Sequence, residues 1–376
     1  MIPANEVHEP SGGTPSWPSW ARLGRKELLA QARNMRIAVL YGGTSSEREV
    51  CLISGRAMIE ALRQAGDCAP RSVVGIEIGK DGHWQVGPER LSPNQAIESL
   101  PTDTIFMIGL HGGEGEGGPI QGFLEISGRA HTGTGVAASA LCLDKIRSRQ
   151  VCARAGIRIA PGVELWPHEI KTDPQEPVQR ILALGPGPWF LKPSLGGSSV
   201  SMGRAHNERE LLEYLERLPA LAPGEGLLVE QAIEGVEVTV GMLADEGRGS
   251  VCLPVVEIQT RQGKWFDFEE KYSDGGALEF CPPKSLSTAQ QEHVQAQAQK
   301  AWNALGLSGY ARLDFIVPQE GAPVLLEANT LPGFTPRSLF PMAAAVSGLP
   351  FNELCVELCL RAWLGHQEAL SSDKDQ

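Results

Sequence analysis

Oxygen-bearing side chains that suit a divalent cation occur on two neighbouring apolar runs near the end of the chain. Asp314 lies in the first run, and Glu327 and Asn329 lie in the second. Two carboxylates and an amide carbonyl form a set of hard oxygen donors, which suits Mg²⁺ and the phosphates that it carries. Arg312 precedes Asp314 by two residues and adds a fixed positive charge. Ordinary surface acids on a polar strand edge are the alternative interpretation, because short motifs also occur by chance.

The two apolar runs are expected to be strands that bring these groups together. The link at residues 318–322 is short and contains glycine, which predicts a tight hairpin. Side chains alternate along a strand, so Glu327 and Asn329 share a face. The hairpin would place Asp314 opposite Leu326 or Glu327, and only the second register gathers all three oxygen donors.

Composition limits the classes of function. The chain has 376 residues, 42% hydrophobic and 21% charged, which is typical of a soluble enzyme with two or three domains. The net charge of −12 argues against a nucleic-acid binder, so an anionic substrate must be held by local cations and backbone N–H groups. Eight cysteines without CxxC or metal-ligand spacing fit a reducing cytoplasm. No apolar run is long enough to span a membrane.

The N-terminal segment differs from the rest of the chain. Residues 1–34 are rich in Pro, Ser, Gly and Trp, and we expect them to form a poorly ordered extension. From residue 35 onward, predicted strands and helices alternate, which indicates an open α/β unit. Its expected strands are residues 36–40 and 104–110.

The first predicted helix follows the first strand. It is expected over residues 44–65, and Ser46 with Glu49 has the spacing of a capping box at its start. Open α/β sheets bind ligands at the carboxyl ends of their strands, where Glu47 and His111 both fall. Alternatively, Glu47 only stabilises the helix start through the helix dipole, and His111 is an ordinary hydrogen-bonded loop residue.

A loop of small residues follows the strand expected at residues 189–193. It spans residues 194–200 and includes Ser198 and Ser199. Small residues let backbone N–H groups approach phosphate oxygens closely, and the hydroxyls add donors. The loop is not a Walker A sequence, because GxxxxGK[ST] does not occur in the chain. A flexible hairpin turn is the alternative.

Two further segments suit a nucleotide. Two predicted strands carry Glu230 and Glu237, and the linker between them would offer backbone groups to an adenine edge while a carboxylate meets the ribose hydroxyls. Residues 264–276 form a polar and aromatic stretch with Lys271 and Tyr272. The glycine pair at its end would serve as a hinge, as in many active-site lids.

Several segments agree in order and spacing with one known family. They are residues 42–50, 192–200, 269–272, 312–314 and 327–335, with Gln121-Gly122 and Thr132-Gly133 between them. From Met35 to about Leu364 the chain thus resembles the D-alanine–D-alanine ligase family of the ATP-grasp superfamily. The resemblance implies an α/β fold of three-domain ATP-grasp architecture, with ATP between the second and third domains. The implied parts are an extension at 1–34, an N-terminal α/β domain at 35–133, a central ATP-grasp subdomain at 134–229, a C-terminal ATP-grasp and Mg²⁺-binding subdomain at 230–366, and a polar tail at 367–376.

The resemblance also implies roles for individual residues. The implied ATP-binding residues are Lys145, Lys192, Ser198, Ser199, Glu230, Ile233, Glu237 and Lys271. The implied ligands of two Mg²⁺ ions, which Mn²⁺ can replace, are Asp314, Glu327 and Asn329. The implied substrate contacts are Glu47, His111, Arg312, Ser338 and Leu339. The implied catalytic set is Glu47, Ser198, Tyr272, Arg312 and Gly333.

The implied activity is that of an ATP-dependent, ADP-forming carbon–nitrogen ligase. ATP would phosphorylate the carboxylate of one D-alanine, and the amine of a second would attack the acyl phosphate. The product would be D-alanyl-D-alanine for peptidoglycan precursors. We expect a cytoplasmic homodimer whose partners are D-alanine and ATP, with neither nucleic acid nor membrane among them.

Four positions depart from the pattern of that family. Cys51 stands where serine is usual, Gly117 where aspartate is common, Gly196 where an acid is usual, and Phe334 where methionine is usual. They leave open a related ligase that joins other amino acids in secondary metabolism. A nicotinamide-binding oxidoreductase is disfavoured because the full GxGxxG is missing after the first strand. A non-catalytic nucleotide-binding module is disfavoured because the predicted Mg²⁺ ligand set is complete.

Overall fold

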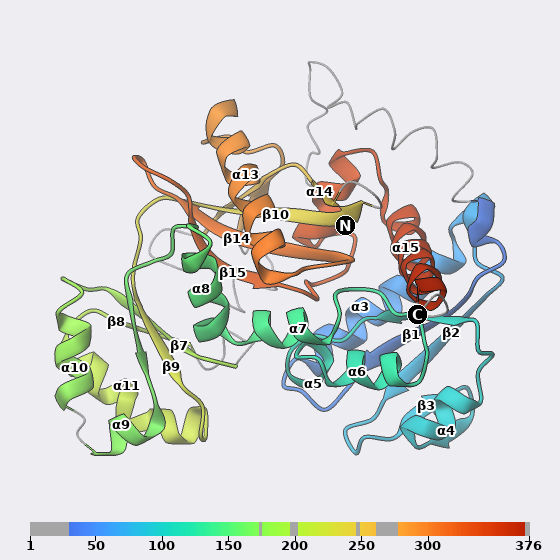
Figure 1. Cartoon of the computed structure of the whole chain (residues 1–376), viewed down its shortest axis with the longest axis horizontal. Coiled ribbons are helices and arrows are strands. Elements are labelled where there is room, and N and C mark those ends of the chain that lie inside the picture. The colour runs from blue at the N-terminus through green and yellow to red at the C-terminus, as the bar shows by residue number, and fades with distance from the viewer. Residues whose placement is uncertain (1–29, 173–174, 196–201, 246–248, 261–276, 373–376) are drawn as a thin grey trace, which may run out of the picture.

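Three β-sheets with their covering helices form the described part of the molecule (Figure 1). The computed structural model describes residues 30–172, 175–195, 202–245, 249–260 and 277–372. In the view of Figure 1, a four-stranded sheet lies on the left, a five-stranded sheet on the right, and a six-stranded sheet above and between them. The predictions for Ser198, Ser199, Lys271 and Tyr272 fall outside the described residues.

The five-stranded sheet has a parallel centre. β1 (Arg36–Gly42) lies between β2 (Ser72–Ile78) and β5 (Thr104–Ile108) and pairs with both in parallel. β3 (Trp84–Val86) and β4 (Glu89–Leu91) extend the sheet in antiparallel pairs. The central residues of β1 are all buried, as expected of a strand whose sheet is covered on both faces. The helices of this unit are α3 (Arg48–Arg63), a 3₁₀ turn (Gly66–Cys68), α4 (Pro93–Glu98), α5 (Gly113–Glu116) and α6 (Pro119–Ile126).

The start of α3 differs from the prediction. The helix begins at Arg48, and its N-cap is Glu47, which makes no side-chain capping hydrogen bond, so the predicted Ser46–Glu49 capping box is wrong. The Ser45 hydroxyl instead accepts the Glu47 N–H at 3.3 Å and donates to the His111 carbonyl at 3.0 Å. A contact with the loop that follows β5 therefore sets the entry into α3.

The four-stranded sheet has the order β6-β9-β7-β8. Its strands are β6 (Gly162–Leu165), β7 (Trp189–Pro193), β8 (Gly203–Ala205) and β9 (Leu227–Gln231), all in antiparallel pairs. Its helices are α9 (Pro167–Thr172), α10 (Gln175–Leu182) and α11 (Glu208–Leu221). The sheet and helices bury a separate core, which includes Leu165, Val178, Leu191, Leu211 and Val229. β9 runs two residues beyond the predicted limit of the central subdomain at residue 229.

The six-stranded sheet carries the hairpin predicted near the end of the chain. Its order is β13-β12-β10-β14-β15, and β11 also pairs with β10. Its strands are β10 (Val236–Asp245), β11 (Gly249–Cys252), β12 (Val256–Gln259), β13 (Leu278–Phe280), β14 (Tyr310–Val317) and β15 (Val324–Asn329). The helices of this half are α7 (Val136–Leu143), α8 (Lys145–Arg154), α13 (Thr288–Leu305), α14 (Leu339–Val346) and α15 (Phe351–Ser372).

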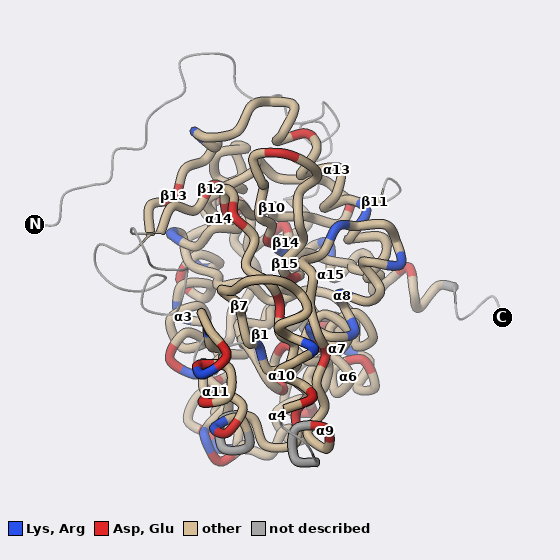
Figure 2. Tube along the Cα trace, turned by 90° about the vertical axis from the view of Figure 1, so that its left-hand side faces the viewer, with Lys and Arg blue, Asp and Glu red and all other residues tan. Residues whose placement is uncertain are grey.

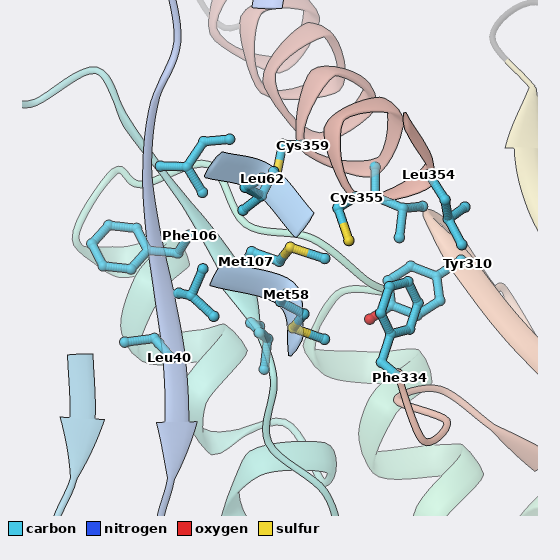
Figure 3. Close-up of a cluster of buried hydrophobic side chains, with 14 of the residues drawn as sticks. Leu40, Met58, Leu62, Phe106, Met107, Tyr310, Phe334, Leu354, Cys355 and Cys359 are labelled. Carbon is cyan, nitrogen blue, oxygen red and sulfur yellow. The ribbon is translucent and has the colours of Figure 1, made fainter. Parts of the chain in front are cut away.

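The two ends of the chain share one hydrophobic core. Figure 3 shows Met58 of α3 and Met107 of β5 close to Cys355 of α15. Tyr310 of β14 and Phe334 of the loop that follows β15 lie beside them. α15 packs against both α3 and β5. The five-stranded sheet is thereby fixed against the C-terminal half, and the loop that carries Phe334 is anchored between them.

Charge is distributed over the whole molecule. Figure 2 shows acidic and basic residues interspersed along the tube, although the chain has a net charge of −12. Among the residues that the structure describes, no single helix is both long and apolar enough to cross a membrane. One pair of helices in the same described part of the chain, Leu339–Val346 and Phe351–Ser371, meets that length and composition together, but it is bent by 100°.

We predict that Gly55→Ala destabilises the protein by about 2 kcal/mol or more. A Cβ atom added at Gly55 in α3 would overlap the side chain of Tyr41 in β1. The matched control is Gly365→Ala in α15, where the added Cβ meets no atom within 4 Å. That change should stabilise by roughly 0.5–1 kcal/mol, because alanine favours helix. Urea-unfolding midpoints of both variants check the pair, and equal shifts would contradict the tight approach of α3 to β1.

Candidate active site

A β-bulge sets the register of the β14–β15 hairpin. Phe315 pairs with Leu325, whereas Asp314 pairs with Glu327, so Leu326 is an extra residue on β15. Without it, the pairing that starts at the turn would place Asp314 opposite Leu326. The bulge shifts the pairing by one residue and brings the two carboxylates to the same face, which confirms the second of the two predicted registers. Arg312 and Asn329 form the next pair on that same face.

Asp314 is held by two neighbours. The Arg312 guanidinium donates to both of its carboxylate oxygens, at 2.9 and 2.7 Å, and the Thr239 hydroxyl from β10 donates to one of them. Both Arg312 and Asp314 are buried. A carboxylate offers about four lone-pair positions, and these donors use three, so Asp314 can still accept one ligand such as a cation. The paired charges also make burial of this carboxylate tolerable.

The oxygen donors at this edge fit a divalent cation. The side-chain oxygen of Asn329 is buried and has no hydrogen-bond partner among the described residues. A buried oxygen in that state needs a partner, and an oxygen-seeking ion such as Mg²⁺ is one that the adjacent carboxylates would favour. No group of three His, Cys, Asp or Glu side chains suited to a metal occurs within the described ranges. The predicted set is consistent with that result, because it contains two carboxylates and an amide.

Two buried lysines face the same acidic edge. Lys145 is the first residue of α8, and its Nζ lies 3.6 Å from a Glu327 oxygen. The backbone N–H of Lys145 donates to the Ser194 carbonyl at 2.8 Å. Lys192 of β7 donates to Glu230 at 2.9 Å. Burial alone would lower the pKa of Lys192, but the carboxylates of Glu230, Glu327 and Glu237 raise it above its ordinary value. Both lysines are therefore placed to meet an anionic ligand.

The predicted adenine and ribose residues lie where β9 passes into β10. Glu230 at the end of β9 is buried between Lys192 and Arg149, whose Nε lies 3.4 Å from the other Glu230 oxygen. Ile233 and Glu237 are half-buried beyond it. The structure brings Glu230 and Glu237 to the electrostatic neighbourhood of Lys192, and the contacts of Ile233 with a nucleotide stay a prediction.

Glu47 lies against the glycine loop that follows β5. Gly112 has a φ of +65°, and a Cβ at this position would come within 2.9 Å of a Glu47 carboxylate oxygen, so only glycine fits. The Gly112 N–H donates to the buried Glu116 at 3.1 Å. Burial raises the pKa of Glu116 to about 7, and the Glu47 charge adds to the effect, whereas Lys145 opposes it. The carboxyl group of Glu116 is thus within electrostatic reach of both Glu47 and Lys145.

His111 connects the N-terminal sheet with the loop that follows β15. Its Nδ1 lies 2.8 Å from the Leu331 carbonyl, and its Nε2 lies 2.8 Å from the Ser54 hydroxyl. Burial lowers its pKa to about 4, and nearby Arg312 contributes in the same direction, so the ring is neutral. Both ring nitrogens therefore contact protein atoms.

The remaining predicted residues line the loop before α14. Gly333 is half-buried between Leu331 and Phe334. Ser338 is the N-cap of α14, and its hydroxyl oxygen accepts the Thr335 N–H at 3.1 Å. Leu339 is buried at the helix start. Their contacts with a substrate stay predictions.

Three residues of this region were missed by the sequence analysis as functional candidates. Thr239 contacts Asp314 only because β10 pairs with β14, and sequence order does not reveal that pairing. Glu116 carries a usable signal, since it is a carboxylate in the glycine-rich stretch just beyond β5. Ser54 belongs to no recognisable motif, and its hydrogen-bond partners, His111 and Phe334, are both distant in sequence.

The fold and the site together define an ATP-grasp ligase. A D-alanine–D-alanine ligase from Bacillus anthracis complexed with ATP has a TM-score of 0.70 and 26% identity, covering 89% of this chain and 99% of that chain. The VanG D-Ala:D-Ser ligase from Enterococcus faecalis has a TM-score of 0.71 and 27% identity, covering 86% and 98%. These similarities confirm the predicted α/β ATP-grasp architecture, and the limits of its domains stay predictions.

Sequence similarity specifies the family. Residues 36–104 match the family described as D-ala D-ala ligase N-terminus, and residues 151–360 match D-ala D-ala ligase C-terminus. A D-alanine–D-alanine ligase from Halalkalibacterium halodurans is 40% identical over 321 residues, which cover 85% of this chain and 96% of that protein. The chain belongs to the D-alanine–D-alanine ligase family.

We predict that Glu116→Gln changes how stability depends on pH. The folded-state pKa of Glu116 is raised from 4.5 to about 7, so its stabilising contribution is complete below pH 4.5 and is lost as the pH rises through about 7. Glutamine does not ionise, so the variant should gain stability relative to the native protein over that interval, by of the order of 1–3 kcal/mol.

The measurement is thermal unfolding of the nucleotide-free protein across this pH range. The matched control is Glu114→Gln, an exposed position on the same short helix. It should keep a constant offset from the native protein. A constant offset for Glu116→Gln as well would show that its carboxyl group is not held in its protonated form by burial.

Proposed function

We propose that this protein joins two D-alanine molecules in an ATP-dependent, ADP-forming reaction that supplies D-alanyl-D-alanine for peptidoglycan precursors. Membership of the D-alanine–D-alanine ligase family supports the reaction type. The observation that carries the proposal is the meeting of Lys145 with the Asp314–Glu327 edge, where cations and oxygen donors face each other. A nucleoside triphosphate needs both, because the cationic side chains contact its phosphates and the oxygen donors hold the metal ions that accompany them.

The nucleotide would lie between the four-stranded and six-stranded sheets. Lys145 and Lys192 would contact its phosphates, and their buried positions strengthen that attraction because water screens it weakly. Glu230 and Glu237 would hold the ribose hydroxyls, and the Ile233 backbone would meet the adenine edge. Lys271, Ser198 and Ser199, which lie outside the described residues, would complete the phosphate contacts.

The acidic edge would hold the metal ions of the reaction. Asp314, Glu327 and Asn329 would bind two Mg²⁺ ions, which would neutralise the charge on the ATP phosphates. The Arg312 guanidinium keeps Asp314 oriented through both carboxylate oxygens. Thr239 fixes the same group from the neighbouring strand.

The first D-alanine would be held beside the loop that follows β5. The Glu47 carboxylate would accept a hydrogen bond from its ammonium group. His111, Ser338 and Leu339 would line the pocket around this D-alanine. Once its carboxylate has been phosphorylated, the amine of the second D-alanine attacks the carbonyl carbon and phosphate leaves. Arg312 and the Gly333 backbone N–H would stabilise the oxyanion that forms during the attack.

Four features of the proposal extend beyond the described site. Ser198 and Tyr272 would join Glu47 in a hydrogen-bonded set that closes over the substrates. Such closure would keep water away from the acyl phosphate. We place the protein in the cytoplasm, which its eight free cysteines support. We also propose that it works as a homodimer.

A substrate panel tests the proposed function. ADP release is measured with D-alanine, D-serine and a series of other D- and L-amino acids, and the dipeptide is identified by mass spectrometry. We expect turnover when D-alanine is the sole amino acid present. The alternative, a ligase for other amino acids, is not favoured by the relatives named D-alanine–D-alanine ligase. Turnover with a different amino acid and none with D-alanine would establish it.

The metal assignment gives a mutational prediction. Asp314→Asn and Glu327→Gln should each lower kcat by at least about 100-fold while the protein stays folded, because each loses one anionic ligand for the cations. The matched control is Glu320→Gln, an exposed change in the turn of the same hairpin, which should keep native activity. Steady-state ADP release and thermal unfolding are the measurements, and near-native turnover in both site variants would remove the assignment.

A further inference from the structure

Two buried side chains hydrogen-bond to the backbone on either side of Gly333, at Leu331 and at Phe334. The His111 ring contacts the Leu331 carbonyl through Nδ1 at 2.8 Å. The Ser54 hydroxyl oxygen accepts the Phe334 N–H at 3.4 Å and lies 2.8 Å from His111 Nε2. The chain path from Leu331 to Phe334 and the path through Ser54 and His111 therefore close a ring around Gly333. We call Ser54, His111 and these two backbone groups the loop clasp.

The chemistry of the partners and the neutral state of the buried His111 ring together fix the direction of every hydrogen bond in the clasp. The Leu331 carbonyl can only accept, so His111 carries its proton on Nδ1. The neutral ring then accepts through Nε2, which makes the Ser54 hydroxyl the donor. The Phe334 N–H can only donate, and it uses a lone pair of the Ser54 oxygen. Each donor in the clasp thus has an acceptor and each acceptor has a donor. Neither ring nitrogen of His111 is left for a substrate.

Packing makes the clasp rigid. Ser54 is fully buried, and His111 is buried as well. The Phe334 ring packs against Tyr310, Phe340 and Phe351 with centroid distances of 5.6, 6.0 and 5.6 Å, and Figure 3 shows it beside Tyr310 and near Met58. The aromatic contacts fix the Phe334 side chain, and the clasp fixes the backbone on both sides of Gly333.

We propose that Ser54 and His111 are positioning residues that hold the Gly333 backbone N–H in place for the condensation step. This inference rests on the proposed function, in which that N–H stabilises the oxyanion formed by attack of the second amine. The hydrogen bonds of the clasp do not involve Lys145 or Lys192, which the proposed function assigns to ATP, so we assign its effect to the step after phosphoryl transfer. A donor aimed at a developing oxyanion is effective only when its position is fixed beforehand.

Ser54→Ala tests the inference. It removes both the donor to His111 and the acceptor for the Phe334 N–H, and kcat for dipeptide formation should fall by about tenfold, with the KM for ATP unchanged within about twofold. In a single turnover, ADP should form at the native rate while dipeptide appears more slowly. The matched control is Ser139→Ala, because Ser139 in α7 is equally buried but its hydroxyl donates to the carbonyl of Thr134, just before that helix. The control should retain native rates for both steps.

The outcomes separate this inference from the proposed function. Native protein that makes no dipeptide from D-alanine overturns the proposed function. Active native protein together with a Ser54→Ala variant of native condensation rate overturns the clasp alone. Equal slowing of ADP formation and dipeptide formation also overturns it, because a general loss of structure would slow both.

A second pair of variants and a spectroscopic measurement cover the case in which Ser54→Ala does not fold. His111→Asn keeps an amide donor near the Nδ1 position, so it should retain more condensation activity than His111→Ala. Nitrogen-15 NMR of histidine-labelled native protein should show one ring protonated on Nδ1 and unprotonated on Nε2 at neutral pH. Equal activity of the two variants, or a His111 ring protonated on Nε2, would contradict the proposed role.

Discussion

The single extra residue in β15 is the constraint on which the site depends. Leu326 shifts the hairpin by one position and places Asp314 opposite Glu327. Two carboxylates on one strand face repel each other unless cations lie between or beside them. The surroundings supply them: Arg312 binds Asp314 through a fork, and Lys145 approaches Glu327 from another part of the chain. The bulge therefore concentrates negative charge, and the positions of the cations follow from it.

The same balance of charge extends from the six-stranded sheet to the four-stranded sheet. Lys192 and Glu230 form a buried pair on the four-stranded sheet, and the pKa of Lys192 is raised by carboxylates of both sheets. Glu116 lies near Glu47 and Lys145, where burial favours its protonated form. A chain with a net charge of −12 thus keeps its cations where an anionic ligand would need them. Local placement, and not overall charge, makes the site suitable for a nucleotide.

The sequence specifies local features of this fold well and long-range pairings poorly. β7 (Trp189–Pro193) has the predicted limits, because an apolar run followed by small residues marks a buried strand end. The choice between Leu326 and Glu327 stayed open in the sequence, since alternation alone does not reveal a bulge. The capping box failed because α3 begins at Arg48 with Glu47, not Ser46, as its N-cap, and the entry into the helix is held by a contact of Ser45 with His111, 66 residues away. Thr239 and Ser54 were missed for the same reason, as each gains its contacts from a distant segment.

The arrangement of the cores indicates which part of the molecule is free to move. The five-stranded sheet, α15 and the loop with Phe334 share one core, so the clasp joins elements that packing already holds together. Within the described ranges, the core of the four-stranded sheet is built from residues between 163 and 229. Units with separate cores move relative to each other unless a large apolar interface joins them. Opening between the four-stranded sheet and the rest would admit a nucleotide to Lys145 and Lys192 without disturbing Glu47, His111 or Gly333. Under the proposed function, the substrate would therefore bind on the side that shares one core, where a fixed oxyanion donor would be most effective.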